Sequence, residues 1–108
     1  MKRIVVLLAA ATLAAPVVAK GNAAAGEAKA KQVCAACHGA DGSTPTTPDF
    51  PYIGGQYYDY LVRTLTDYRT GARKNAIMAG MAKPLTDQEV QDLAAYFAAQ
   101  PGKLGTKK

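Results

Sequence analysis

The residues of this chain best suited to chemistry lie together in one short segment, Cys34-Ala35-Ala36-Cys37-His38. The two cysteines and the histidine in it are the only ones among the 108 residues. Thiols and an imidazole can form a disulfide, bind a metal ion or attach a prosthetic group. This segment is therefore the first candidate site.

Four kinds of site compete for the segment. A structural disulfide between Cys34 and Cys37 would close a very small loop and leave His38 without a role. A thioredoxin-like redox pair expects a βαβ setting, which the sequence lacks. A zinc site needs four ligands, and the chain offers only three soft ones, all of them adjacent.

The fourth kind of site is covalent attachment of a c-type haem, for which Cys-x-x-Cys-His is the recognised spacing. Each thiol adds across one vinyl group to form a thioether, and the two intervening residues let one helical turn present both sulfurs. His38 follows directly and can bind the iron as the proximal ligand. We predict one covalent haem c, attached through Cys34 and Cys37.

The ligand on the other face of the iron decides the class of function. Met78, Met81, a lysine or only water could occupy that position. A methionine thioether raises the reduction potential and is typical of electron-carrying cytochromes c, whereas an open position suits gas binding or peroxide chemistry. The sequence has no second histidine and no obvious acid–base pair, so it offers few groups for an enzymatic reaction.

Three helical segments are expected to position these groups, and no β-strand pattern stands out. The first spans about 23–37 and contains both cysteines. The second spans about 57–70, with apolar and aromatic residues on one face. The third opens with a Thr86–Glu89 capping box and ends before Pro101. Its predicted core stripe comprises Val90, Leu93, Ala94 and Phe97.

Two long loops, 39–55 and 71–84, join these helices, and such loops in a small domain are usually functional or wrapped around something. The core is thin, since the chain has no tryptophan and only two phenylalanines. A domain of this size needs a disulfide, a metal or a bulky bound group for stability. A porphyrin would fill that need.

Residues 1–19 are expected to be a cleaved signal peptide with a basic start, an apolar run from Ile4 to Ala15 and a small-residue cleavage site at Ala19. The apolar run is shorter than the roughly 20 residues of a membrane-spanning helix. We therefore expect export to the periplasm without a membrane anchor. Residues 20–108 would form one domain with 11 basic and 8 acidic residues, a net charge of +3. That charge is too mild to suggest nucleic-acid binding.

Three stretches make the chain resemble the class I c-type cytochromes of the small bacterial kind, which occur singly or as units of tandem two-haem proteins. Residues 26–42 match the family's first helix and haem motif, and residues 50–56 (Phe-Pro-Tyr-Ile-Gly-Gly-Gln) match its turn. Residues 78–87 match its methionine-rich approach to the last helix. The resemblance implies an all-α fold, in which three main helices and long loops surround one covalent haem.

The resemblance also implies roles for single residues. The iron-ligating methionine of the family lies seven residues before the leucine that opens the last helix, and counting back from Leu85 gives Met78, with Met81 as the alternative. The carbonyl of Pro51 is expected to accept the ring N–H of His38. Several residues remain open as partners of a haem propionate or of the methionine sulfur: Tyr57, Tyr58, Tyr60, Arg73 and Asn75.

These patterns predict a periplasmic carrier of single electrons rather than an enzyme, with no small-molecule substrate. Its partners would be redox proteins such as membrane oxidoreductases or terminal oxidases and reductases. The alternatives are an electron-transfer subunit of a larger oxidoreductase and a haem enzyme with an open sixth iron position. Charged residues could orient docking on an acidic partner: Lys31, Arg73, Lys74 and Lys83 near the site, and Asp87, Glu89 and Asp92 on the last helix.

Overall fold

The structure is a computed structural model that describes residues 3–6, 21–102 and 104. Most of the expected signal segment, residues 1–19, lies outside the described residues. Within them the regular structure is entirely helical, which confirms the predicted all-α class. In chain order the helices are α1 Ala23–Val33, α2 Ala35–His38, α3 Tyr58–Thr70, α4 Ala76–Ala82 and α5 Asp87–Ala99.

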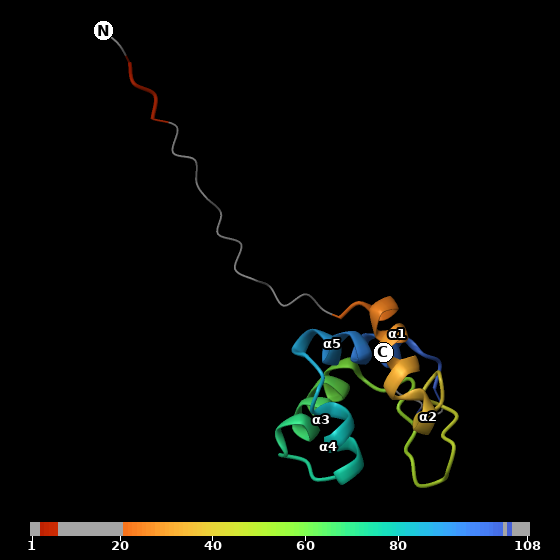
Figure 1. Cartoon of the computed structure of the whole chain (residues 1–108). Coiled ribbons are helices and arrows are strands. Elements are labelled where there is room, and N and C mark those ends of the chain that lie inside the picture. Colours follow the sequence, from red (N-terminus) through yellow and green to blue (C-terminus); the bar gives the residue numbers. More distant parts are fainter. Residues whose placement is uncertain (1–2, 7–20, 103, 105–108) are drawn as a thin grey trace.

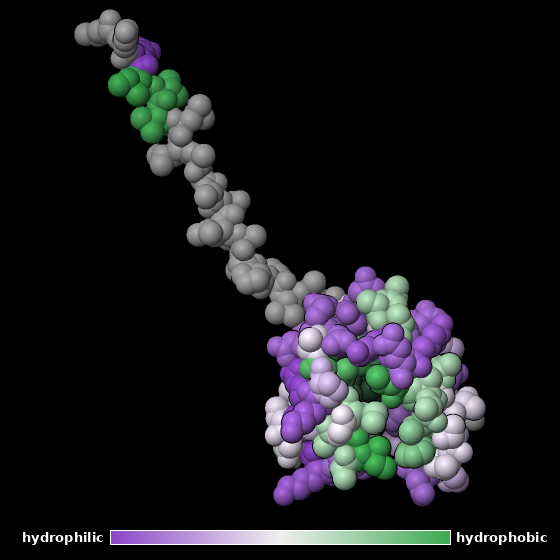
Figure 2. All heavy atoms as spheres, viewed as in Figure 1, coloured by the Kyte–Doolittle hydropathy of each residue, from purple (hydrophilic) through white to green (hydrophobic). Residues whose placement is uncertain are grey.

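The helices are arranged in two groups beneath α5. In Figure 1, α1 crosses beside α5, α3 and α4 lie on one side, and α2 with the long loop after it lies on the other. Figure 2 shows hydrophobic residues gathered around a hollow on this face of the molecule. The candidate site residues on α2 and on α4 therefore belong to opposite sides of the fold.

The first and last long helices cross with their backbones in contact. Gly26 of α1 is buried, and a β-carbon there would lie only 1.9 Å from the carbonyl oxygen of Asp92 on α5. The carboxylate of Asp92, a residue that is 8% exposed, accepts the backbone N–H of Asn22 at 2.7 Å. It also accepts the side-chain amide of Gln88 at 2.8 Å. This crossing ties the start of α1, and through it the cysteine motif, to the most buried helix.

Helix α5 begins and packs as the sequence predicts. The Thr86 hydroxyl accepts the Glu89 N–H at 3.1 Å, and the Glu89 carboxylate accepts the Thr86 N–H at 3.1 Å, so the capping box is confirmed. Such a cap contributes about 1 kcal/mol. The residues of the predicted stripe are buried, and so is Tyr96: Val90, Leu93, Ala94 and Phe97.

The hydrophobic core is as thin as the composition suggests. Three of its nine buried apolar residues are alanines, namely Ala30, Ala82 and Ala94. The largest side chains that are fully buried are only Leu93 and Val90. Since small domains depend on additional cross-links or bound groups, this core is a physical reason to expect one.

Two local expectations need correction. The single helix expected over 23–37 is interrupted, because α1 ends at Val33 and Cys34 adopts φ −109° and ψ −36° before α2 begins. The region 71–84, expected to be a loop, contains α4. Helix α3, in contrast, ends as predicted at Gly71, which takes the left-handed conformation with φ 86°.

Candidate functional site

Helix α2 is one turn that brings the motif residues together. The N–H groups of Cys37 and His38 both donate to the Cys34 carbonyl, at 3.2 Å and 3.0 Å. Both cysteines are free and half-buried. Burial is the largest effect on the Cys34 thiol and raises its pKa to about 11. A protonated thiol is a poor redox nucleophile, which argues against the thioredoxin-like interpretation.

The His38 ring is held in one orientation. Only 7% of the residue is exposed, and its Nδ1 lies 2.9 Å from the Pro51 carbonyl oxygen. A carbonyl can only accept, so Nδ1 carries the proton and Nε2 keeps its lone pair. A neutral imidazole with a free Nε2 is the form that binds a metal, and the hydrogen bond at Nδ1 increases its basicity.

Glycine in the 39–55 loop brings Pro51 to this position. The Gly42 carbonyl accepts the N–H groups of Ile53 at 2.8 Å and Gly54 at 2.9 Å. The loop is then fastened to α5, where the Phe97 carbonyl accepts the Gly55 N–H at 2.8 Å. Gly42 has φ 73°, a conformation that is costly for residues with a β-carbon.

Replacing Gly42 with alanine is expected to loosen both the loop and the His38 ring. The new β-carbon would lie 2.7 Å from the Gly54 nitrogen and 2.8 Å from Cδ1 of Phe97. The left-handed backbone and the overpacking together should reduce the free energy of unfolding by about 2–4 kcal/mol. Thermal denaturation of the exported protein measures this loss. The exposed Gly71→Ala, also at positive φ but with no atom within 4 Å of the added carbon, isolates the backbone cost and should lose less.

The two methionines considered as ligands lie one turn apart on α4. Met78 is partly buried, whereas Met81 is 46% exposed. The Asn75 side-chain oxygen accepts the N–H groups of Ile77 at 3.1 Å and Met78 at 3.0 Å. Asn75 therefore caps the helix that carries Met78, with its side-chain oxygen used by the backbone. An asparagine directly before an apolar run is an N-cap signal, and here it marks the residue at which α4 begins.

The three tyrosines considered as partners of a haem propionate have different surroundings. The Tyr58 hydroxyl donates to the Gln91 side chain at 3.2 Å, and Tyr57 is 48% exposed. The Tyr60 hydroxyl accepts from Arg73 at 3.4 Å. A shallow depression of about 280 Å³ contains none of the motif residues and is lined by Tyr57, Tyr58, Asp59 and Ala98.

Comparison with known proteins identifies the family. Residues 23–100 match the protein family described as Cytochrome c. The chain belongs to the cytochrome c family. Within the described residues, no three His, Cys, Asp or Glu side chains gather into a metal cluster of another kind. The family match and the Cys-x-x-Cys-His motif together support one covalent haem c in this cytochrome c, as predicted.

Individual relatives agree with the family. The chain is 52% identical over 81 residues to cytochrome c4 of Thiocapsa roseopersicina. The match covers 75% of this chain and 41% of the relative. It is 48% identical over 87 residues to cytochrome c4 of Pseudomonas aeruginosa, and that match covers 81% of this chain and 42% of the relative. The crystal structure of reduced cytochrome c4 from Pseudomonas stutzeri superposes with a TM-score of 0.70 at 41% identity, covering 79% of this chain and 48% of that one. The chain therefore spans about half the length of these relatives.

The residues present fit a covalently attached haem. Two unpaired thiols flank one helical turn, and the adjacent imidazole is fixed with Nε2 as its lone-pair nitrogen. The thin core adjoins a hollow bordered by hydrophobic residues (Figure 2). Cys34 and Cys37 would hold the porphyrin, and His38 would bind its iron.

Proposed function

We propose that this cytochrome c is a carrier of single electrons in which His38 and Met78 are the two iron ligands. When bound, the haem supplies a reversible Fe(III)/Fe(II) couple, whose potential a methionine ligand raises. The observation that carries the proposal is the Nδ1 hydrogen bond from His38 to Pro51. It prepares the imidazole as a fixed ligand, and a fixed ligand set suits electron transfer rather than substrate turnover.

The chain's own residues would keep this site rigid in both oxidation states. Cys34 and Cys37 would hold the porphyrin on α2, and the hydrogen bond to Pro51 restricts rotation of the His38 ring. The Asn75 cap anchors the start of α4 beneath Met78. Met78 is preferred over Met81 because it is the more buried of the two, and a thioether that faces inward is the one available to a group inside the fold.

Visible spectroscopy of the exported protein in both oxidation states tests this proposal. We expect the spectrum of a six-coordinate haem with thioether attachment, and a ferric charge-transfer band from a methionine ligand. Carbon monoxide should not bind the ferrous protein readily without denaturant. A protein that lacks the methionine band and binds carbon monoxide readily would instead have an open sixth position, and the carrier function would be wrong.

The place of action is proposed to be the periplasm, with residues 1–19 removed as a signal peptide. The basic start and the small-residue pattern at Ala19 support this proposal. None of the helices in the described ranges is long and apolar enough to cross a membrane. An intact mass that corresponds to a chain beginning near Lys20 plus one haem would agree. Retention of the first residues would contradict it.

The partners are proposed to be redox proteins with an acidic docking face. The acidic residues of α5 are engaged within the molecule, since Asp87 pairs with Arg69 and Glu89 pairs with Lys29. By contrast, Arg73, Lys74 and Lys83 have no carboxylate partner among the described residues, and they flank α4 on either side. The positive charges of Lys74 and Lys83, next to the methionine helix, would favour acidic surfaces.

Raising the ionic strength should slow electron exchange with an acidic redox protein. The Debye length falls from about 30 Å at 0.01 M salt to about 8 Å at 0.15 M, so the attraction is screened and the second-order rate constant should fall at least several-fold. Stopped-flow spectroscopy at the haem absorption measures it. A rate constant that is independent of salt would rule out electrostatic docking, while the carrier function would stand.

A further inference from the structure

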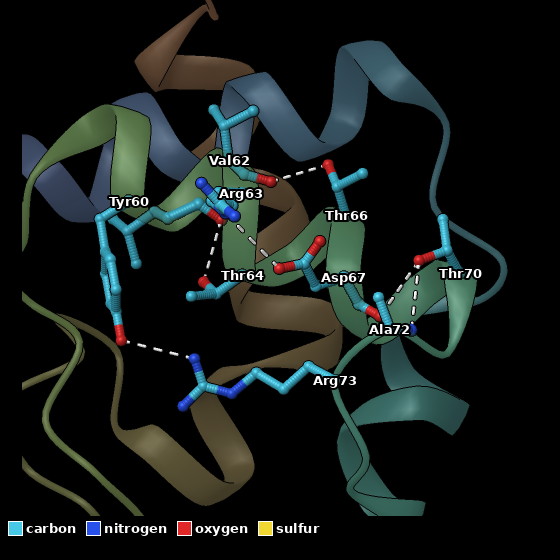
Figure 3. Close-up of polar contacts among 10 residues, drawn as sticks. Tyr60, Val62, Arg63, Thr64, Thr66, Asp67, Thr70, Ala72 and Arg73 are labelled. Atoms are coloured by element: carbon cyan, nitrogen blue, oxygen red, sulfur yellow. Dashed lines mark hydrogen bonds and ion pairs between the residues drawn. The ribbon is translucent and has the colours of Figure 1, made fainter.

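Within residues 21–102, Arg73 is a surface cation that two tyrosines of α3 contact from different sides. Its guanidinium donates to the Tyr60 hydroxyl at 3.4 Å, and its central carbon lies 5.2 Å from the centre of the Tyr68 ring. Its backbone N–H also donates to the Asp67 carbonyl at 3.1 Å. Figure 3 shows Tyr60 and Arg73 extending toward each other beneath α3. Holding a long side chain in one place costs rotamer entropy. Because the contacts with the two tyrosines already hold Arg73, less of that entropy is lost when its guanidinium binds a ligand.

The protein supplies no carboxylate for this guanidinium. Within residues 21–102, Lys29, Lys31, Arg63 and Arg69 are each paired with an acidic side chain. Three cations of that region remain without one, namely Arg73, Lys74 and Lys83, and all are exposed. Of these three, only Arg73 makes a side-chain hydrogen bond or ring contact with another of the described residues. Its neighbour Asp67, the nearest acidic residue in sequence, pairs with Arg63 at 3.8 Å.

A haem c carries two propionate carboxylates, and an arginine fork is the protein group best matched to a carboxylate. Arg73 also lies in the segment that leads directly into α4, five residues before Met78. We propose that Arg73, oriented by Tyr60 and Tyr68, binds a haem propionate. Arg73 is then a cofactor-binding residue, and Tyr60 is a positioning residue that acts through it. The inference rests on haem attachment and does not depend on which methionine is the sixth ligand.

The arrangement makes a specific electrostatic prediction. Carboxyl groups ordinarily titrate near pH 4, and a hydrogen-bonded guanidinium stabilises the ionised form. Removing that guanidinium should raise the pKa of the propionate back to the ordinary value of a carboxyl group. Loss of a positive charge beside the haem should also lower the reduction potential, because the ferric state carries one more positive charge than the ferrous state.

The test is to measure the reduction potential of the haem-loaded protein against pH for Arg73→Gln, Tyr60→Phe and Lys74→Gln. Arg73→Gln should lower the potential and shift the propionate-linked titration upward. Tyr60→Phe should give a smaller shift in the same direction. Lys74→Gln removes an equal charge at the next residue, so it reports any general charge effect and should leave the titration where it is. Arg73→Lys should restore part of the effect.

Two outcomes would overturn the inference. The first is an unchanged titration in Arg73→Gln, and the second is an equal shift in Lys74→Gln. Proton NMR of the propionate methylene groups provides a readout that a merely structural role of Arg73 would not move. Absence of the ferric methionine band from the unmodified protein would instead count against the proposed carrier function. Failure of the Arg73 inference and failure of the carrier function therefore give different results.

Discussion

Replacing both Cys34 and Cys37 with alanine is expected to leave a largely unfolded and protease-sensitive chain. The two side chains are only half-buried, so the loss of their own packing is small. The large effect comes from the prosthetic group that they hold. Without it, the hollow side of the fold has no filling, and the remaining core has Leu93 and Val90 as its largest fully buried side chains.

The size of this effect follows from how little stability a small domain has. Natural domains are stable by only about 5–15 kcal/mol, and a core of nine residues that includes three alanines falls short of what a chain of this length needs. Circular dichroism and limited proteolysis of the double variant measure the outcome. Ala36→Ser, at the exposed position between the cysteines, keeps both thiols and should fold with haem attached. A compact double variant that melts cooperatively would contradict the prediction.

Replacing Met78 with alanine is expected to change the iron site more than any other single substitution outside the cysteine and histidine motif. The ferric methionine band should disappear, the reduction potential should fall, and the ferrous protein should bind carbon monoxide without denaturant. The expected cause is loss of a soft, neutral ligand that favours the ferrous state. Removing a partly buried methionine should also cost roughly 1–3 kcal/mol of stability.

Met81→Ala is the matched control, because it removes the same side chain one turn away on the same helix. Met81 is 46% exposed, so this variant should keep the band and lose little stability. The reverse result, with the band retained in Met78→Ala and lost in Met81→Ala, would transfer the ligand role to Met81. Absorption spectra and redox titrations of the two variants decide between them.

Much of the fold could be predicted from local signals. Helix α5 is marked by a Thr86–Glu89 capping box and a regular apolar stripe, and Gly71 marks the end of α3. These signals act within a few residues, so the sequence alone reveals them. The haem motif is also local, because both thioethers and one iron ligand must come from a single turn.

What could not be predicted depends on contacts between distant residues. Helix α4 has only seven residues, too few to be stable alone, and it forms where it packs against α3 and receives the Asn75 cap. The break at Cys34, which lies between α1 and α2, likewise has no marker in the adjacent sequence. The arrangement of Tyr60 with Arg73 joins residues 13 apart, and no pattern in either segment points to the other.

The contact of Gly26 with Asp92 also bears on the order of events during synthesis. The two residues are separated by most of the domain, so α1 emerges from the ribosome well before its packing partner exists. At synthesis rates of about 5–20 residues per second, the delay is on the order of several seconds. The Cys-x-x-Cys-His segment therefore exists first as an open, accessible peptide. The last helix packs against α1 only afterwards, so the chain order separates the appearance of the motif from the completion of the domain.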